Sequence, residues 1–320
     1  MAIFVIIVLG GGYCFKLIQA PLVRSGKPAV IIRVAPNTSA RSLINLLSDK
    51  KLIKMPELWL LLARLCGFAN HLKAGYYQIN PGDTGIILLH KIVNGAVVVE
   101  SFRIIEGTTS MDVRRNLTVA PYLNYDTAVV NNMVLQITQH HLSEEGLLLA
   151  ATYFYNAGSA AQELLWRAHI ELMKALDYYW RARSDHLPYT NPYEMLVAAS
   201  IIEKETALDL ERKIISGIIV NRINLHMPLQ MDPTVMYIFN SNWHNISRLT
   251  HQNLSVDSPY NTYLHRGLPP TPIAIVGKAA LEAAAHPLKV DYLYFYANSD
   301  GSHKFSKTYR EQQKAIRRQM

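Results

Sequence analysis

The spacing of hydrophobic residues changes between two periods along the first third of the chain. Alternation with a period of two is typical of strands, and recurrence every three to four residues is typical of helices. The expected elements are a strand at residues 29–34, a helix capped by Thr38 or Ser39, a helix after Pro56, a strand at residues 76–79, a helix ending near Asn94-Gly95 and a strand in AVVVESFRII. Together these elements predict a small α+β unit over residues 28–105.

The rest of the chain is expected to be mostly helical at first and richer in loops after residue 222. Residues 160–183 place leucine and alanine at helical spacing, which predicts the clearest helix of this region. Asn191-Pro192 is typical of a helix start, because proline is tolerated in the first helical turn. Further on we expect a strand in DYLYFYANSDGSHKFS and a basic C-terminal helix. The predicted fold class is therefore α+β, with a small subdomain followed by a larger mixed domain.

The chain opens on an apolar segment, MAIFVIIVLGGGYCFKLIQA. Its uncharged part spans residues 2–15, and it reaches the roughly 20 residues of a spanning helix if Lys16 extends to the interface. No small-residue cleavage site follows, so we expect an uncleaved transmembrane anchor over residues 1–20 rather than a signal peptide. Lys16, Arg24 and Lys27 follow this segment, whereas an inside N-terminus carries its positive residues before it. Charge leaves the orientation open, and either the true start lies upstream or the anchor is atypical.

Composition narrows the class of partner. Half of the 320 residues are apolar and 18% are charged, which is typical of a chain with a packed core. The net charge of +8 suits an anionic partner such as a membrane surface, a nucleic acid or a wall glycan. No stripe of basic and aromatic residues accompanies this charge, so nucleic acid is disfavoured.

No cofactor or metal is expected from the motifs present. The chain has no P-loop, no dinucleotide-binding fingerprint and no G-x-S-x-G elbow. His140 and His141 lack a partner at metal-ligand spacing, which argues against a zinc site. Cys14 and Cys66 lie in different regions, so the fold is not expected to depend on a disulfide.

Two carboxylates follow the apolar run of ASIIEKET. Residues two apart lie roughly 200° apart around a helix, so Glu203 and Glu205 should point to nearly opposite sides. Glu205 shares the apolar stripe that precedes it, where loss of water raises the pKa of a carboxyl and suits it to general-acid catalysis. Glu203 lies elsewhere, where Lys204 and Arg212 can solvate or pair it. Periodicity alone leaves open that both are surface charges after a buried turn.

Several downstream loops carry groups that could line a sugar-binding cleft. They are Gln230, Asp232 and Thr234 in LQMDPTV, Tyr260, Asn261, Thr262 and Tyr263 in YNTY, and His303 in GSHKF. Each also has a structural interpretation, since Asp-Pro-Thr is typical of a turn or helix start and a lone histidine is usually satisfied within the fold. Taken together, the residues predict one semi-buried acid beside a polar, aromatic cleft, which is compatible with cleavage of a glycosidic bond.

Six blocks of sequence occur in a fixed order over about residues 195–308. They are ASIIEKET, ERKIISGIIVNRI, MPLQMDPTVMY, YNTYLHRGLPPTPIA, HPLKVDYLYFYAN and GSHKFSKT. In content and order they resemble the YceG-like (MltG) family of endolytic murein transglycosylases. KAGYYQI and RIIEG, further upstream, resemble the family's LysM-like subdomain and the junction after it, so the resemblance covers nearly the whole chain.

The resemblance implies a domain organisation and a location. A single-pass anchor in the bacterial inner membrane would occupy residues 1–20, a LysM-like subdomain residues 28–105, and the catalytic domain residues 106–320, in the periplasm. The implied partners are peptidoglycan glycan strands and the inner membrane, and peptidoglycan synthases are a further partner that the resemblance suggests. The implied role is to limit the length of nascent glycan strands, without a cofactor.

The resemblance also implies roles for individual residues. The second glutamate of the E-K-E-T block, Glu205, is the implied catalytic residue, acting as general acid and then as general base to leave a 1,6-anhydro-N-acetylmuramic acid end. The matching cleft motifs place Glu203, Gln230, Asp232, Tyr260, Asn261, Thr262 and His303 as implied substrate-binding residues. One departure is visible: Ala150 and Ala151 stand where the family usually has Pro and Asp, which removes a rigid turn and a carboxylate.

Two alternatives remain beside the transglycosylase interpretation. One is a glycoside hydrolase that uses Glu205 with a second carboxylate such as Asp232. The other is a membrane-tethered peptidoglycan-binding protein without activity, which the Ala150-Ala151 departure motivates.

Overall fold

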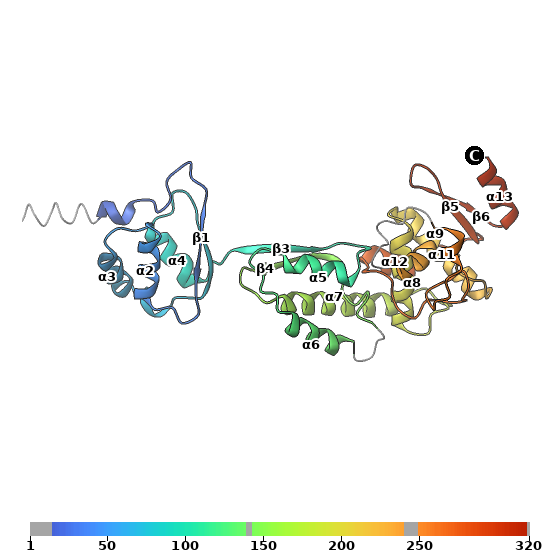
Figure 1. Cartoon of the computed structure of the whole chain (residues 1–320), viewed down its shortest axis with the longest axis horizontal. Coiled ribbons are helices and arrows are strands. Elements are labelled where there is room, and N and C mark those ends of the chain that lie inside the picture. Colours follow the sequence, from blue (N-terminus) through green and yellow to red (C-terminus); the bar gives the residue numbers. More distant parts are fainter. Residues whose placement is uncertain (1–14, 139–142, 240–248, 319–320) are drawn as a thin grey trace, which may run out of the picture. The chain divides into compact units, whose positions relative to one another are not determined.

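The computed structural model describes residues 15–138, 143–239 and 249–318 (Figure 1). The chain divides into two compact units, each of which is described by itself. The first unit extends to Ser101 and includes Pro121–Asn124 and Phe154–Ser159. The second unit comprises Phe102–Ala120, Tyr125–Tyr153 and the chain from Ala160 onward.

The first unit packs helices against a two-stranded antiparallel sheet (Figure 1). β1 (Val30–Val34) pairs with β2 (Gly75–Ile79) in a register that sets Val30 opposite Ile79. The helices are α2 (Ala40–Asp49), α3 (Pro56–Leu65) and α4 (Gly85–Asn94), and a short 3-10 turn, η1, spans Phe68–Asn70.

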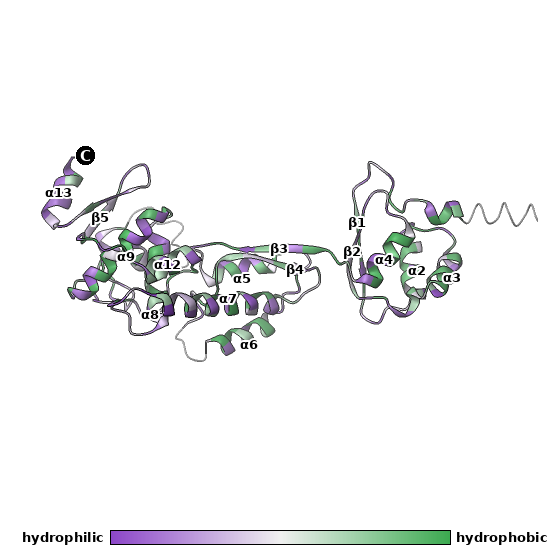
Figure 2. Ribbon diagram, turned by 180° about the vertical axis from the view of Figure 1, so that it is seen from behind, coloured by the Kyte–Doolittle hydropathy of each residue, from purple (hydrophilic) through white to green (hydrophobic). Residues whose placement is uncertain are grey.

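The core of the first unit explains why these segments fold as they do. Ser39 and Thr84 cap α2 and α4 by accepting hydrogen bonds from backbone N–H groups in the first helical turn. Leu43, Leu88 and Ile92 then face the sheet and are almost completely buried. Figure 2 shows how strongly hydrophobic α4 is as a result.

The second unit is mainly helical. Its helices are α5 (Ser110–Thr118), α6 (Thr127–Ile137), α7 (Ala161–Ala182), α8 (Pro192–Glu205), α9 (Asp209–Asn224), α10 (Asp232–Ile238), α11 (His251–Leu254), α12 (Lys278–Ala285) and α13 (Tyr309–Arg317). β5 (Tyr294–Ala297) and β6 (His303–Ser306) form an antiparallel hairpin. β3 (Val99–Ile104) and β4 (Ala151–Asn156) form a separate two-stranded sheet, and the division between the two units falls within both strands.

Helix α8 is the centre of the second unit. Every residue from Met195 to Ile202 is buried, and the helix contacts α7, α9, α10 and α12. Alanines on α8 and α12 leave room for the two backbones to approach closely. Burial on all sides requires an apolar surface all round the helix, which accounts for the long apolar run before the two carboxylates.

The ends of α8 are fixed by local interactions. Asn191 accepts a hydrogen bond from the Glu194 N–H, and Pro192 occupies the first turn. At the other end Thr206 is extended and stops the helix directly after Glu205. Glu205 is thus the last helical residue, at the point where the buried helix ends.

The observed elements confirm the predicted α+β class and most of the expected helices and strands. Two differences stand out. Strand β4 lies within a segment that was expected to be mostly helical, because ATYFYN alternates exposed and buried residues. The single strand expected in DYLYFYANSDGSHKFS is a hairpin that turns at residues 298–302.

The predicted anchor over residues 1–20 falls largely on residues 1–14, which lie outside the described residues. Among the residues that the structure does describe, no helix combines the length and the apolar character that crossing a membrane requires.

The tight packing of α9 generates a stability prediction. A Cβ atom added at Gly217 would lie 2.3 Å from the Leu288 carbonyl oxygen, so Gly217→Ala forces a backbone to move. We expect this variant to lose about 1–3 kcal/mol of unfolding free energy, despite the higher helix propensity of alanine. Urea unfolding measures the loss, and Leu210→Ala, at an exposed position of the same helix, is the control. Equal stability of the two variants would contradict the packing described here.

Candidate active site

The Glu205 side chain lines an open pocket with a volume of about 660 Å³. The pocket is built from the end of α8, the segment before α10 and the β5–β6 hairpin with α13. The lining residues are Glu205, Arg222, Leu229, Gln230, Asp232, Tyr263, Tyr294, Phe295, Tyr296, Ala297, His303, Tyr309 and Gln312. Acid, amide and aromatic groups therefore face one space that is large enough for sugar rings.

The environment of Glu205 favours its protonated form. Burial, together with the negative charge of Asp232, raises the pKa of the Glu205 carboxyl from its ordinary 4.5 to about 8. The residue is half-buried and keeps part of its surface open to the pocket. Its place at the C-terminus of α8 acts in the same direction, because the negative end of the helix dipole disfavours a carboxylate.

Asp232 is held beside this acid by a tyrosine. The Tyr263 hydroxyl donates a hydrogen bond of 2.5 Å to the Asp232 carboxylate. Burial and this hydrogen bond raise the pKa of Tyr263, so the phenol stays protonated and remains a donor. The pocket therefore contains one carboxyl that resists ionisation and a second whose position is fixed by a hydrogen bond from a neutral donor.

Arg222 of α9 ties two walls of the pocket together. Its Nε donates to the Leu293 carbonyl at 2.7 Å, just before β5, and its Nη1 donates to the Pro228 and Leu229 carbonyls and to the Gln230 side chain. The guanidinium also lies 5.1 Å from the centre of the Tyr294 ring. A buried arginine with so many acceptors acts as a rigid connector in the fold.

A second connector joins the residue after Glu205 to the hairpin. Glu211 accepts hydrogen bonds from the Thr206 hydroxyl at 3.0 Å, from the His303 N–H at 2.8 Å and from the His303 ring Nδ1 at 2.7 Å. His303 also lines the pocket, so these contacts fix part of its wall. Glu211 thus links the end of α8, the helix that carries Glu205, to β6.

Glu203 points away from the pocket, as the helical geometry predicts. Its carboxyl accepts hydrogen bonds from the Gly277 N–H at 2.8 Å and from the Arg212 guanidinium at 3.3 Å. The expected pairing with Arg212 is therefore present, whereas Lys204 donates to the Gly107 carbonyl. Burial raises the pKa of Glu203, but its contacts are those of a group that connects α8 to α9 and α12.

The YNTY segment lies behind the pocket wall, and only Tyr263 lines the pocket. The Tyr260 hydroxyl contacts the Thr271 hydroxyl at 2.8 Å. Asn261 donates both amide hydrogens to the Leu254 and Val256 carbonyls, and its oxygen accepts from the Tyr263 N–H. No amide donor of Asn261 is left for a substrate acetamido group, which differs from the role expected of it.

Thr262 has a similar structural position. Its hydroxyl accepts the Met231 N–H at 3.0 Å and contacts the Thr234 hydroxyl at 2.8 Å, while its carbonyl accepts the Gln230 N–H. These bonds hold the start of α10, and with it Asp232, against the YNTY segment. Of the predicted substrate-binding residues, the structure brings Gln230, Asp232 and His303 together with Glu205, and leaves Glu203, Tyr260, Asn261 and Thr262 outside the pocket lining.

An aromatic cleft was predicted, but its tyrosines on β5, Tyr294 and Tyr296, and the two connectors, Arg222 and Glu211, were not among the predicted residues. Tyr294 and Tyr296 alternate in the predicted strand DYLYFYAN, a period that places both on one face, and this was the available signal. Arg222 in IIVNRI and Glu211 in LER gave no signal of their own in the sequence. The contacts that tie them to the β5–β6 hairpin lie 71 and 92 residues further along the chain. Only the fold shows that they act on the pocket.

The Ala150-Ala151 departure lies apart from Glu205. Ala150 is buried, and its N–H donates to the Val276 carbonyl at 2.9 Å. Just before it, the buried Glu145 accepts hydrogen bonds from the Ser110 N–H and hydroxyl, and burial raises its pKa to about 7. Neither alanine lines the pocket around Glu205.

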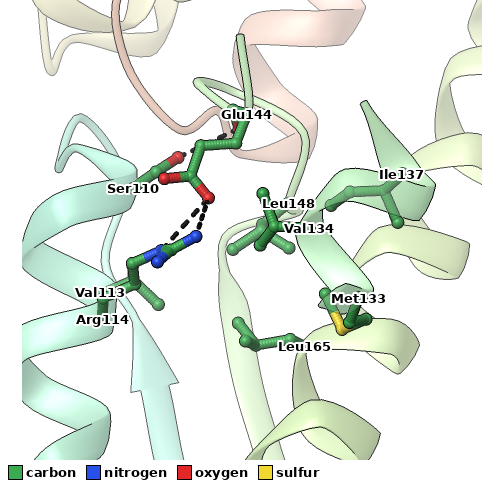
Figure 3. Close-up of a pocket in the computed structure, with 9 residues that line it drawn as sticks. All are labelled: Ser110, Val113, Arg114, Met133, Val134, Ile137, Glu144, Leu148 and Leu165. Carbon is green, nitrogen blue, oxygen red and sulfur yellow. Dashed lines mark hydrogen bonds and ion pairs between the residues drawn. The ribbon is translucent and has the colours of Figure 1, made fainter. Parts of the chain in front are cut away.

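A small cavity between α5, α6 and α7 is too small for a sugar (Figure 3). Its volume is about 10 Å³, which is about the space of a single water. Figure 3 shows Leu148, Leu165 and Met133 on its apolar side and the Arg114–Glu144 ion pair, at 2.7 Å, on its polar side.

Within the described residues, no cluster of three or more His, Cys, Asp or Glu side chains could hold a metal ion. His140 and His141 lie outside those residues.

The chain is similar to known proteins of one family. A model of the YceG-like family matches residues 32–318. An endolytic murein transglycosylase of Bacillus subtilis (strain 168) is 29% identical, covering 97% of this chain and 90% of its own length. One from Streptococcus pneumoniae serotype 2 (strain D39) is 26% identical, covering 87% of this chain and 56% of its own.

A solved structure shows the same likeness. The crystal structure of a YceG-like protein from Listeria monocytogenes superposes with a TM-score of 0.55 at 28% identity, covering 91% of this chain and 100% of the other. With a family model matched along almost its entire length, the chain belongs to the YceG-like family.

Proposed function

We propose that this chain is a peptidoglycan lytic transglycosylase that cleaves the bond between N-acetylmuramic acid and N-acetylglucosamine, with Glu205 as its acid and base. The observation that carries the proposal is the position of the Glu205 carboxyl, at the end of a buried helix and on the wall of an open pocket, where burial raises its pKa. Membership of the YceG-like family and the transglycosylase names of two relatives support it.

The first step uses the proton that Glu205 holds at neutral pH. Glu205 donates it to the glycosidic oxygen as the bond to the muramic-acid anomeric carbon breaks, and positive charge develops on the ring. The Asp232 carboxylate, on the same pocket wall, stabilises this charge electrostatically. Because Tyr263 donates to Asp232, the carboxylate is oriented before the substrate arrives.

The second step returns the proton. The Glu205 carboxylate takes the proton of the muramic-acid C6 hydroxyl, whose oxygen attacks the anomeric carbon of its own ring. The C6–O–C1 bridge forms, the released strand keeps the first proton, and Glu205 is protonated again without consumption of water. An internal nucleophile has a high effective concentration, so a single acid and base suffices.

The aromatic and amide groups of the pocket suit the binding of a glycan strand. Tyr294, Tyr296 and Tyr309 offer ring faces that can stack on sugars, and Gln230 and Gln312 offer donors and acceptors for hydroxyl or acetamido groups.

The proposed domain organisation and cellular location come from the sequence resemblance. Residues 1–20 anchor the chain in the bacterial inner membrane, residues 28–105 form a LysM-like subdomain, and residues 106–320 act on peptidoglycan in the periplasm. In this position the enzyme limits the length of nascent strands next to the synthases that make them. The excess of basic residues suits an anionic wall polymer.

A two-carboxylate hydrolase is the second candidate, because Asp232 lines the same pocket as Glu205. In that enzyme a water would attack, and the product would carry a reducing end in place of the anhydro end. The hydrogen bond from Tyr263 to Asp232 favours the transglycosylase, since it occupies an oxygen of the carboxylate that would have to accept the proton of an attacking water.

Replacement of the acid tests both the role of Glu205 and the reaction class. Glu205→Gln should reduce strand cleavage by at least about 10³-fold, because the amide cannot donate the proton, and its unfolding transition should remain cooperative. Mass spectrometry of digested peptidoglycan should show ends lighter by one water with the unaltered enzyme. Hydrated ends would establish the hydrolase, and binding without any product would establish an inactive glycan-binding protein.

The raised pKa of Glu205 predicts how activity depends on pH. Since the protonated form is the catalyst, kcat/KM should be constant below about pH 8 and fall about tenfold per pH unit above it. If kcat/KM falls from pH 5 upward instead, the pKa of the Glu205 carboxyl is not raised and the prediction is contradicted.

The same shift has a consequence for stability. The folded pKa is above the unfolded one, so the native state holds the extra proton and stability decreases as pH rises from about 4.5 to about 8. Glu205→Gln should therefore match the unaltered protein below pH 4.5 and be more stable above pH 8, by on the order of 1–3 kcal/mol after allowance for solvent in the pocket. Urea titrations across this range measure the difference.

A further inference from the structure

Helix α3 of the first unit is apolar on two opposite faces. Trp59, Leu60 and Ala63 pack into the core of the unit and are at most 3% exposed. On the opposite face Leu61 is 54% exposed and Leu65 is 75% exposed. A surface helix normally carries polar residues on the face that it turns away from the core, so this second apolar face indicates a partner.

The exposed face is a stripe rather than a scattering of single residues. Leu58, Leu61 and Leu65 are spaced by three and four positions, so they lie along one side of α3, and Leu58 is half-buried. Met55, which precedes the helix and is 47% exposed, extends the stripe at its N-terminal end. We refer to Met55, Leu58, Leu61 and Leu65 as the leucine stripe.

Cationic residues adjoin the leucine stripe along the chain. Lys50, Lys51 and Lys54 are exposed in the loop between α2 and α3, and Arg64 is exposed on α3 itself. The acidic residue of α3, Glu57, lies 3.9 Å from Arg41, which offsets its charge. An apolar stripe with a basic border is the pattern of helices that lie in the interface of an anionic membrane.

The composition favours a lipid surface over a protein. Protein interfaces are enriched in aromatic residues and arginine and depleted in lysine at their centres, and leucine is under-represented among their energetic anchors. The stripe and its border consist mainly of leucine and lysine, with Met55 and Arg64 as the exceptions and no aromatic residue. Long lysine side chains can lie along the apolar stripe while their ammonium groups reach lipid phosphates.

The position of α3 in the unit agrees with this partner. Ile18 and Leu22, close to the start of the described chain, pack against the core of the same unit. Both Figure 1 and Figure 2 draw α3 and this start of the chain at the end of the unit that is away from β1. The residues that precede Lys16 are the apolar segment AIFVIIVLGGGYCF.

We propose that the leucine stripe of α3 inserts into the headgroup region of an anionic lipid bilayer, with Lys50, Lys51 and Lys54 on the lipid phosphates. This contact is separate from the pocket around Glu205 and does not depend on the proposed activity. It also does not depend on a membrane-spanning N-terminus, because the stripe provides its own apolar surface.

A native cysteine allows a direct test in the full chain. Cys66 directly follows α3 and is exposed, and Cys14 is the other cysteine of the chain. In a Cys14→Ser background, Cys66 is labelled with a polarity-sensitive fluorophore and mixed with vesicles of phosphatidylcholine alone or with one third phosphatidylglycerol. We expect a blue shift and a several-fold intensity increase with the anionic vesicles, and protection from quenching by iodide.

Control variants separate this contact from anchoring by the N-terminal segment. Gln78 lies on the exposed side of β2. When Cys66 is replaced by serine and the fluorophore is attached at Gln78→Cys, its emission should not shift with either kind of vesicle. Leu61→Gln with Leu65→Gln should abolish the shift at Cys66 without lowering thermal stability, because both leucines are exposed. Lys50→Gln with Lys54→Gln should weaken the affinity for the anionic vesicles about 25-fold, about fivefold for each lysine.

The outcomes decide the proposal in either direction. A shift that depends on anionic lipid and on the two leucines supports it. An unchanged Cys66 signal from protein that sediments with the vesicles would overturn it, and so would equal signals with both kinds of vesicle or a failure to bind either. Strand cleavage by the same samples reports on the proposed activity independently.

Discussion

The Glu205 carboxyl sits where a buried helix ends, and burial, the helix dipole and the charge of Asp232 all oppose its ionisation. The packing of α8 offsets the cost of placing an acid there, since every residue from Met195 to Ile202 is buried and the helix contacts α7, α9, α10 and α12. Because Thr206 ends the helix directly after Glu205, the acid reaches the pocket and does not continue into the core. The proposed chemistry depends on this one arrangement.

The pocket is held together by groups from distant parts of the chain. Arg222 joins the segment before α10 to β5, and Glu211 joins Thr206 to His303, so the walls opposite Glu205 are fixed by buried, charge-assisted hydrogen bonds. A rigid wall keeps sugar and acid aligned, which is the requirement for an internal nucleophile to replace water. The first unit adds a surface of a different kind, the leucine stripe, which suits a lipid bilayer.

Sequence reasoning succeeded where the determinants are local. Helical spacing separates Glu203 from Glu205 and pairs Glu203 with Arg212, and capping residues such as Ser39 and Asn191 mark helix starts. It could not assign the loops, because a side chain such as that of Asn261 can bind either backbone or substrate, and only the fold shows that the neighbouring carbonyls occupy it. The aromatic wall and both connectors depend on contacts about 70 to 90 residues apart, which no local pattern records.

Direct titration of the Glu205 side chain is the most decisive measurement. Carbon-13 NMR of protein labelled at glutamate Cδ, with Glu205→Gln to assign the signal, reports its protonation. The account predicts that this carboxyl is still largely protonated at pH 7 and titrates near pH 8. A signal that titrates near the ordinary value of 4.5 would contradict it, because an ionised Glu205 has no proton to donate.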